Sequence, residues 1–218
     1  MASSTLTTSN TLAQAAWPRR ADAPAWARDA FLVVAFSLVT ALSAQVVIPL
    51  APVPITGQTF GVLLTGALLG PRLGAMAMAL YLLEGGLGLP FFAGGAGGAG
   101  GAGGAGGAAR LVGPTGGYLL SYPFAAALVG GLAVRGWDRK PLTMLAAMLL
   151  GSLVVFALGA GWLAHFVGPG RAVTLGVLPF LPGDAVKALA AAGLLPLGWK
   201  WAGTKNPYPT PPREDGRE

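Results

Sequence analysis

Three ionisable side chains lie inside stretches of apolar sequence, where a charge is costly and usually serves a function. Glu84 follows one such stretch, and Asp184 and Lys187 begin another, directly after a Pro-Gly pair. Asp184 and Lys187 are three residues apart, so on a helix they share one face. Charged residues within membrane spans usually face the protein interior and pair with one another. This pair would neutralise itself and still offer hydrogen bonds to a polar ligand.

Each of these residues can also be explained by a purely structural role, in which it binds no ligand. Asp184 can cap the start of a helix, and the long side chain of Lys187 can extend to the membrane surface. Glu84 stands just before two glycines, so it can lie at the membrane surface near a helix end. All three residues remain candidates for a binding site at this point.

Other kinds of reactive site find little support in the residues. The chain has no cysteine and a single histidine, His165, which argues against a metal centre. Ser152 and His165 fall on one predicted helix, about 20 Å apart along its axis, so they cannot form a catalytic dyad together. We therefore expect no metal, no cofactor and no enzyme activity.

The composition indicates the environment of these candidates. Of 218 residues, 54% are hydrophobic and only 10% are charged, and the mean hydropathy is +0.64. A water-soluble domain carries about 25% charged residues, and a disordered chain is poor in hydrophobic residues. Both classes are excluded, which leaves an integral membrane protein. In such a protein the net charge of +6 relates first to orientation rather than to nucleic acid, and no nucleic-acid partner is expected.

Six apolar segments are long enough, or nearly so, to cross a bilayer, which takes about 20 residues. They cover about residues 30–49, 56–69, 73–89, 115–134, 142–167 and 181–201. Glycine–proline pairs separate several of them, as expected for turns. The second is short, and we expect it to be tilted or broken at its Pro-rich start. The predicted fold is all-α, a bundle of six transmembrane helices.

The positive charges predict how this bundle is oriented. With the N-terminus inside, the inner segments hold Arg19, Arg20, Arg28, Arg72, Arg135, Arg139, Lys140, Lys200, Lys205, Arg213 and Arg217. The outer loops hold only Arg110 and Arg171, so the distribution agrees with the positive-inside rule. Both termini are expected in the cytoplasm, and the chain is expected to be a multi-pass protein of the cell membrane.

The predicted domain organisation is simple. Residues 1–27 form a disordered cytoplasmic lead-in, residues 28–202 the membrane domain, and residues 203–218 a disordered cytoplasmic tail. Residues 94–107 are only glycine and alanine and form an external loop between the third and fourth spans. This loop is either a low-complexity insertion or a mobile lid over an outward-facing cavity. No Lys-Ser/Thr follows it, so it is not a phosphate-binding P-loop.

The first span also carries small residues at four-residue spacing. Ser37 with Ala41, and Thr40 with Ala44, would let another helix approach closely. The pattern leaves open whether that helix belongs to this chain or to a partner subunit.

Five ordered motifs between about residues 30 and 200 resemble one family of membrane proteins. They are PVPITGQTFGVLL at 52–64, LGPRLG at 69–74, GLPFFAGG at 88–95, GPTGGY at 113–118 and LPFLPGDAVK at 178–187. The chain thereby resembles the BioY family, the biotin-binding S-components of energy-coupling-factor (ECF) transporters. The resemblance implies six transmembrane helices, capture of biotin, and an energising module made of a membrane scaffold subunit and ATP-binding subunits. The chain itself has no Walker motif, and its glycine tract is longer than the family's usual loop.

The resemblance also assigns roles to the candidate residues. It implies that Asp184 and Lys187 bind biotin. From their chemistry we expect Asp184 to accept from the ureido N–H groups, Lys187 to donate to an oxygen of the ligand, and Arg110 to reach the carboxylate. Tyr118 and two pairs of glycines would wall the pocket, with Glu84 as a further intramembrane candidate; the glycines are Gly94, Gly95, Gly116 and Gly117. The face formed by Ser37, Thr40, Ala41 and Ala44 would dock the partner module.

Three other functions were weighed against biotin binding. An S-component for another vitamin, such as riboflavin or thiamine, would share the fold. A membrane-embedded enzyme is disfavoured because no nucleophile and base stand at a useful spacing. A structural or channel protein would gain little from the two charges of Asp184 and Lys187.

The topology can be tested directly, because the chain has no cysteine of its own. With cysteine introduced at Ser3 or at Ala102, we expect a membrane-impermeant thiol reagent to label only Ala102→Cys in whole cells. Labelling of Ser3→Cys but not of Ala102→Cys would reverse the orientation.

Overall fold

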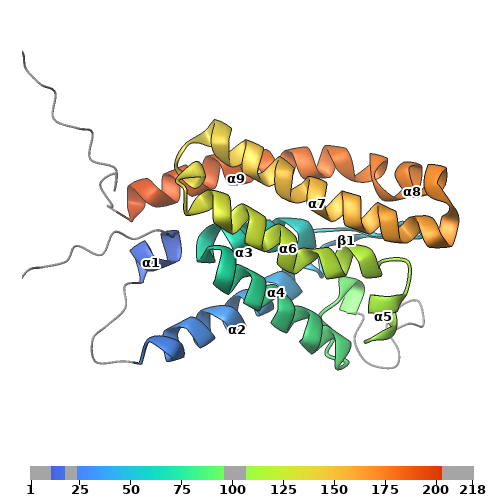
Figure 1. The fold of residues 1–218 in the computed structure, drawn as a ribbon, viewed down its shortest axis with the longest axis horizontal. Helices are drawn as coiled ribbons and strands as arrows, with labels where there is room; N and C mark the ends of the chain where they lie inside the picture. The colour runs from blue at the N-terminus through green and yellow to red at the C-terminus, as the bar shows by residue number, and fades with distance from the viewer. Residues whose placement is uncertain (1–10, 18–23, 96–106, 203–218) are drawn as a thin grey trace, which may run out of the picture.

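The computed structural model describes residues 11–17, 24–95 and 107–202, and the chain in these ranges is mostly helical (Figure 1). The helices are α1 (Leu12–Ala16), α2 (Ala25–Ser43), α3 (Gln58–Leu69), α4 (Pro71–Gly86), α5 (Ala109–Val112), α6 (Gly116–Ala133), α7 (Pro141–Val167), α8 (Pro169–Gly176) and α9 (Leu181–Trp201). Three 3₁₀ turns are η1 (Ala93–Gly95), η2 (Trp137–Arg139) and η3 (Leu178–Phe180). Strands β1 (Val47–Ile48) and β2 (Ile55–Thr56) form a short antiparallel hairpin.

Every one of the predicted spans corresponds to a helix, namely α2, α3, α4, α6, α7 and α9. Within the described ranges, four segments are long and apolar enough to cross a membrane: Trp26–Ser43, Gly116–Ala133, Pro141–Val167 and Pro169–Trp201. Helix α3 has only 12 residues and α4 has 16, both short of a full crossing. The prediction of a largely helical membrane protein is confirmed, and the count of six crossings stays a prediction.

The predicted end of the first span was wrong. The first span was expected to continue to residue 49, but α2 ends at Ser43 and the chain then forms the β1–β2 hairpin. The prolines of this segment explain the difference, because proline cannot continue a helix. Within the predicted lead-in, residues 12–16 form α1, and Leu12 packs against the core. The predicted domain organisation itself stays a prediction. The rest of the lead-in up to residue 23, the tail and most of the glycine tract lie outside the described residues.

Glycine–proline pairs turn the chain sharply between long helices, as the sequence predicted. Gly70 separates α3 from α4 with φ 85°, and Gly168 separates α7 from α8 with φ 84°. A positive φ costs glycine little, and a proline at the first helical position is already in helical conformation. Each pair therefore ends one helix and starts the next without a loop.

Helix α6 lies at the centre of the bundle, between α3, α4 and α7 (Figure 1). A Cβ at Gly66 of α3 would come within 2.3 Å of the carbonyl oxygen of Ala126 in α6. A Cβ at Gly130 would come within 2.4 Å of the backbone of Gly70. These glycines let backbones meet directly, which is how membrane helices pack closely.

The small-residue face of α2 is used inside this chain. Ser37, Thr40, Ala41 and Ala44 are all buried, where α2 packs against α3 and α4. The Thr40 hydroxyl bonds to the Phe36 carbonyl oxygen at 3.0 Å and contacts the Met78 sulfur at 3.9 Å. These small side chains serve a contact between helices of this chain, which is one of the two alternatives that the sequence left open, and docking of a partner module by this face stays a prediction.

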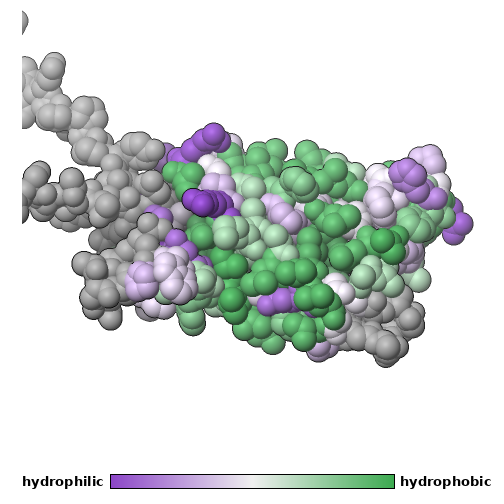
Figure 2. Space-filling model, turned by 60° about the horizontal axis from the view of Figure 1, so that its bottom comes forward, coloured by the Kyte–Doolittle hydropathy of each residue, from purple (hydrophilic) through white to green (hydrophobic). Residues whose placement is uncertain are grey.

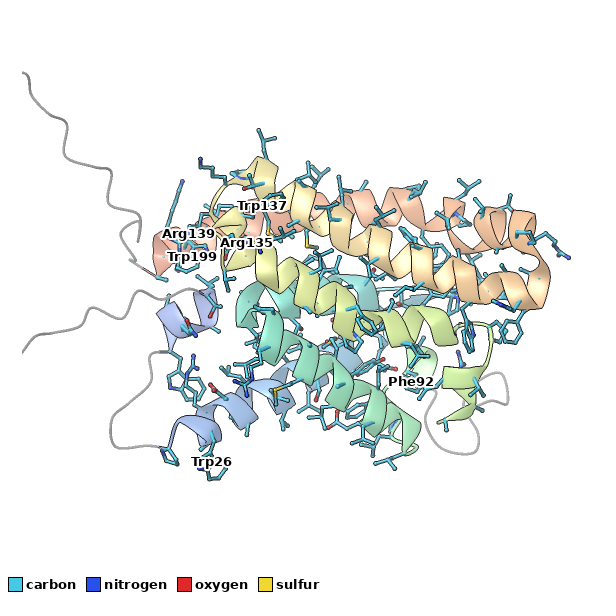
Figure 3. All side chains as sticks on the ribbon, in the orientation of Figure 1. Trp26, Phe92, Arg135, Trp137, Arg139 and Trp199 are labelled. Atoms are coloured by element: carbon cyan, nitrogen blue, oxygen red, sulfur yellow. The ribbon has the colours of Figure 1, made fainter. Side chains whose placement is uncertain are left out.

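The two ends of the molecule differ in charge. We call them the α1 end, with α1, η2 and the end of α9, and the α8 end, with α5, α8 and the start of α9 (Figure 1). Basic residues gather at the α1 end, where Figure 3 labels Arg135 and Arg139. Lys140 follows η2 directly, and Lys200 lies in the last turn of α9. Between the two ends the surface is mainly apolar (Figure 2). This pattern agrees with the predicted orientation, in which the α1 end faces the cytoplasm, and the orientation stays a prediction.

A buried carboxylate fastens α9 at the α1 end. Asp138 of η2 is fully buried, and its Oδ2 accepts a hydrogen bond from the Trp199 indole nitrogen at 2.6 Å. The Arg139 guanidinium lies 4.1 Å from the centre of the Trp199 ring, on which it stacks. Figure 3 shows Arg139 and Trp199 together there. Burial raises the pKa of Asp138 to about 6, although the Trp199 hydrogen bond and the Arg139 charge lower it in part.

This raised pKa predicts a pH-dependent stability. The folded protein binds the Asp138 proton more tightly than the unfolded chain, whose aspartates have pKa values of about 3.9. The contribution of Asp138 to stability is therefore full below pH 4 and is lost as the pH rises to about 6, a change of about 3 kcal/mol. Asp138→Asn cannot ionise but can still accept from Trp199. We expect the difference in Tm between this variant and the parent, measured in detergent, to shift in favour of the variant by several degrees between pH 4.5 and pH 7. A difference in Tm that does not change with pH would contradict the assignment.

Candidate functional site

A pocket lies at the α8 end, between the β1–β2 hairpin, η1, α5, α6, α7 and η3. Its empty space, counted together with the open mouth, is about 550 Å³. The residues that line it are mostly apolar, with a few polar groups: Val53, Pro54, Thr56, Gln58, Thr59, Phe92, Ala93, Arg110, Thr115, Tyr118, Leu119, Tyr122, Val155, Phe156 and Phe180. This composition suits a ligand with an apolar body and a few hydrogen-bonding groups.

Aromatic rings form the apolar part of the pocket. The Tyr118 and Phe180 rings stack with centroids 6.4 Å apart, and Phe156 meets Phe180 edge-on at 6.2 Å. The Tyr118 hydroxyl donates to the Gly176 carbonyl oxygen at 2.8 Å, which fastens the ring to the end of α8. These rings offer flat apolar surface whose positions are already set.

A buried hydrogen-bond network forms the opposite wall. Gln58, the first residue of α3, is 4% exposed and lines the pocket. Its side-chain oxygen accepts from the Tyr122 hydroxyl at 3.3 Å and from the Thr56 hydroxyl at 3.2 Å. Its side-chain nitrogen donates to the Tyr81 hydroxyl. The amide orientation of Gln58 is thus held by three separate segments of the chain.

Asp184 and Lys187 lie directly behind this wall, in the first two turns of α9. The Lys187 ammonium is 3.1 Å from Asp184 Oδ1, and it also donates to the Thr59 hydroxyl at 2.7 Å and to the Thr56 carbonyl oxygen at 2.9 Å. Thr59 in turn donates to Asp184 Oδ1 at 3.3 Å. The pair itself is not part of the pocket lining, but the two threonines that it holds are.

These contacts decide between the alternatives for the pair. The cap of α9 is Phe180, and no side chain bonds to the first turn, so Asp184 is not a helix cap. Lys187 is 20% exposed and turns toward α3, so it does not extend to the membrane surface. The second carboxylate oxygen of Asp184, Oδ2, is buried and has no hydrogen-bond partner. An unpaired carboxylate oxygen in the protein interior is costly and can accept a hydrogen bond from a ligand.

Two of the predicted site residues do line the pocket. Tyr118 contributes its ring, and Arg110 contributes from the short helix α5 at the mouth. Arg110 is half-buried there, and a guanidinium in this position suits a carboxylate at the outer end of a ligand.

The four predicted glycines lie elsewhere. A Cβ at Gly116 would come within 2.1 Å of the Leu111 carbonyl oxygen, and one at Gly117 within 2.2 Å of Trp162. These two glycines therefore allow α6 to pack closely, and they do not line the pocket. Gly94, at φ 69°, and Gly95 follow the lining residue Ala93 in η1, at the edge of the pocket. Their absence from the lining leaves a role in ligand contact as a prediction.

Glu84 lies near the end of α4, outside the pocket lining. Its Oε2 is buried without a hydrogen-bond partner. Among the described residues, no group of three or more histidine, cysteine, aspartate or glutamate side chains is placed to hold a metal ion.

Sequence reasoning missed the residues that build most of the wall. Gln58, Thr59, Tyr122, Phe156 and Phe180 line the pocket but were not proposed as site residues. The signal for the first two was present, since polar side chains at the start of a short apolar span are unusual and stand in a quoted motif. The three aromatic residues look like ordinary core residues in the sequence.

Comparisons with known proteins agree on one family. The family model described as "BioY family" matches residues 9–204. A probable biotin transporter BioY from Pyrococcus horikoshii is 40% identical over 165 residues, covering 76% of this chain and 92% of the relative. The biotin transporter BioY from Thermotoga maritima is 37% identical over 161 residues, covering 72% of this chain and 87% of the relative.

A solved structure is similar as well. It is the crystal structure of the S-component for biotin from an ECF-type ABC transporter, which matches with a TM-score of 0.67 and 26% sequence identity. The match covers 80% of this chain and 92% of the solved chain. Together with the pocket and with the family model, which spans nearly the whole chain, these similarities show that this chain belongs to the BioY family.

Proposed function

We propose that this protein is a membrane-embedded biotin-binding subunit that takes part in biotin uptake, and that it is not an enzyme. The observation that carries the proposal is the pocket at the α8 end, with the Asp184–Lys187 pair and its unpaired carboxylate oxygen directly behind Thr56 and Thr59. Membership of a family whose relatives are described as biotin transporters supports biotin as the ligand.

The chemistry of biotin suits the arrangement of the pocket. Its fused rings are largely apolar, its ureido group both donates and accepts hydrogen bonds, and its valerate chain ends in a carboxylate. The ureido group would lie against Thr56 and Thr59, which line the pocket in front of the pair. Where it reaches past them, its N–H groups would meet Asp184, which can only accept, and an oxygen would meet Lys187, which can only donate. The rings would lie against Tyr118 and Phe180, and the carboxylate would reach Arg110 at the mouth. Gly94 and Gly95 would border the ligand at the rim.

Uptake requires a source of energy that this chain does not contain. Its sequence has no Walker motif, so ATP hydrolysis would come from separate ATP-binding subunits, coupled through a membrane scaffold subunit. The likeness to an S-component of an ECF-type ABC transporter supports such a module. In this proposal the chain is a multi-pass protein of the cell membrane, with the basic α1 end in the cytoplasm and the pocket open to the outside.

Titration of the detergent-purified protein with biotin tests the function and the Asp184–Lys187 pair together. Removing one member leaves the other charge buried and unpaired, which costs about 3–5 kcal/mol when burial is complete. We expect Asp184→Asn and Lys187→Met each to raise the Kd for biotin by at least about tenfold, or about 1.4 kcal/mol. If the folded parent binds riboflavin or thiamine instead of biotin, the ligand assignment is wrong.

The double variant Asp184→Asn/Lys187→Met separates binding from folding. It removes both charges at once and so avoids an unpaired charge in the interior. We expect it to be as stable as the parent in detergent and still to bind biotin weakly. Parent-like affinity in the double variant would show that the pair serves only to join α9 to α3.

Arg110 has a matched control in Arg171, an exposed arginine of α8 at the same end of the molecule. We expect Arg110→Ala to weaken biotin binding less than the changes at Asp184, because Arg110 is only half-buried. Biotin amides, which lack the carboxylate, should lose less affinity on this change than biotin does. Equal effects of Arg110→Ala and Arg171→Ala would remove Arg110 from the site.

A further inference from the structure

Two adjoining edges of the pocket come from separate parts of the chain. One edge is the segment from Val53 to Thr59, which includes β2 and the start of α3. The other is formed by Phe92 and Ala93, which lead into the glycine tract. Each edge needs a fixed position if the pocket is to have a fixed shape.

A single hydroxyl group joins these edges. Tyr81 in α4 is fully buried and is not part of the pocket lining. Its hydroxyl accepts a hydrogen bond from the Gln58 side chain on one edge and donates to the Phe91 carbonyl oxygen at 3.0 Å on the other. Tyr81 stands 23 residues after Gln58 and 10 residues before Phe91 in the sequence.

The ring of Tyr81 supports the same edge by packing. It stacks with Phe91 at 6.5 Å between centroids and meets Phe92 edge-on at 5.6 Å. Phe92 is 1% exposed and lies against Gly85, where a Cβ would come within 2.4 Å of its ring. Phe92 is therefore seated between Tyr81 and the bare backbone of α4, near the α8 end (Figure 3).

We propose that Tyr81 is a positioning residue for ligand binding: its hydroxyl holds the Gln58 amide and the Phe91–Ala93 segment in a fixed position relative to each other, beside the pocket. The proposal rests on the proposed function for the identity of the ligand, but not for the contact itself. Tyr81 touches no ligand and acts by keeping both edges in place. Without the hydroxyl the Phe91–Ala93 edge loosens, and a bound ligand escapes more easily.

Binding kinetics test this role. Tyr81→Phe keeps the ring and its packing and removes only the hydroxyl. We expect biotin to dissociate at least about tenfold faster from this variant, with an association rate within about threefold of that of the parent, since most changes of affinity appear in dissociation. Unchanged dissociation, or a loss confined to association, would overturn the proposal.

A second measurement needs no ligand. Ala93→Cys is a single cysteine in a chain that has none, and Ala93 is only 9% exposed. We expect Tyr81→Phe to raise the rate at which a small thiol reagent labels Ala93→Cys without biotin by at least about tenfold. Tyr118→Phe is the matched control, because it also removes a buried hydroxyl that donates to a backbone carbonyl, but at Gly176. Equal acceleration by both variants would mean general loosening rather than a specific contact.

A further variant covers the case in which Tyr81→Phe does not fold. Gly85→Ala keeps the Tyr81 hydroxyl and places a methyl group against the Phe92 ring, which must then shift. It should also raise labelling at Ala93→Cys and speed dissociation; labelling at the parental rate would overturn the role of this edge. If labelling responds as expected while biotin neither binds nor protects Ala93→Cys, the positioning role stands and the ligand assignment fails.

Discussion

The ammonium group of Lys187 sits where α9 enters the apolar body of the protein, and its charge must be balanced there. The balance comes from Asp184 one turn earlier and from Thr56 and Thr59, which stand 131 and 128 residues earlier in the chain. A buried charge without such partners would be strongly destabilising. The requirement fixes the start of α9 against the start of α3, and the pocket forms beside this contact.

In the apolar interior, close contact between helix backbones fixes the positions of the helices. Water-driven burial does not hold helices together within a bilayer, so packing must do so. Gly66 and Gly130 let α3, α4 and α6 meet without side chains between them. The bundle is rigid around α6, while the pocket lies at the α8 end, where short elements such as η1 and α5 carry its rim.

The helices and the charged pair could be predicted because their signals are local. Gly70-Pro71 and Gly168-Pro169 mark helix ends in a few letters, and the three-residue spacing of Asp184 and Lys187 places them on one face. Contacts between distant segments have no such signal. Gln58 meets Tyr81 and Tyr122 only because α3, α4 and α6 cross there, and Ser37 or Gly117 can equally serve a partner, a ligand or a neighbouring helix. At Ser37 and Gly117, the small side chain indicates that another group lies close by, but it does not show whether that group belongs to a partner, a ligand or a neighbouring helix.

Tyr118 shows how residues outside a pocket can determine its size. Its ring occupies space left by two glycines: a Cβ at Gly159 would come within 2.2 Å of the ring, and one at Gly176 within 2.2 Å of the hydroxyl. A side chain at either position would displace this ring, which lines the pocket. Selection for a smaller or larger substrate can therefore act on α7 and α8 while every residue that contacts the ligand is retained. The size of this pocket therefore depends partly on Gly159 and Gly176, which a comparison of lining residues alone would overlook.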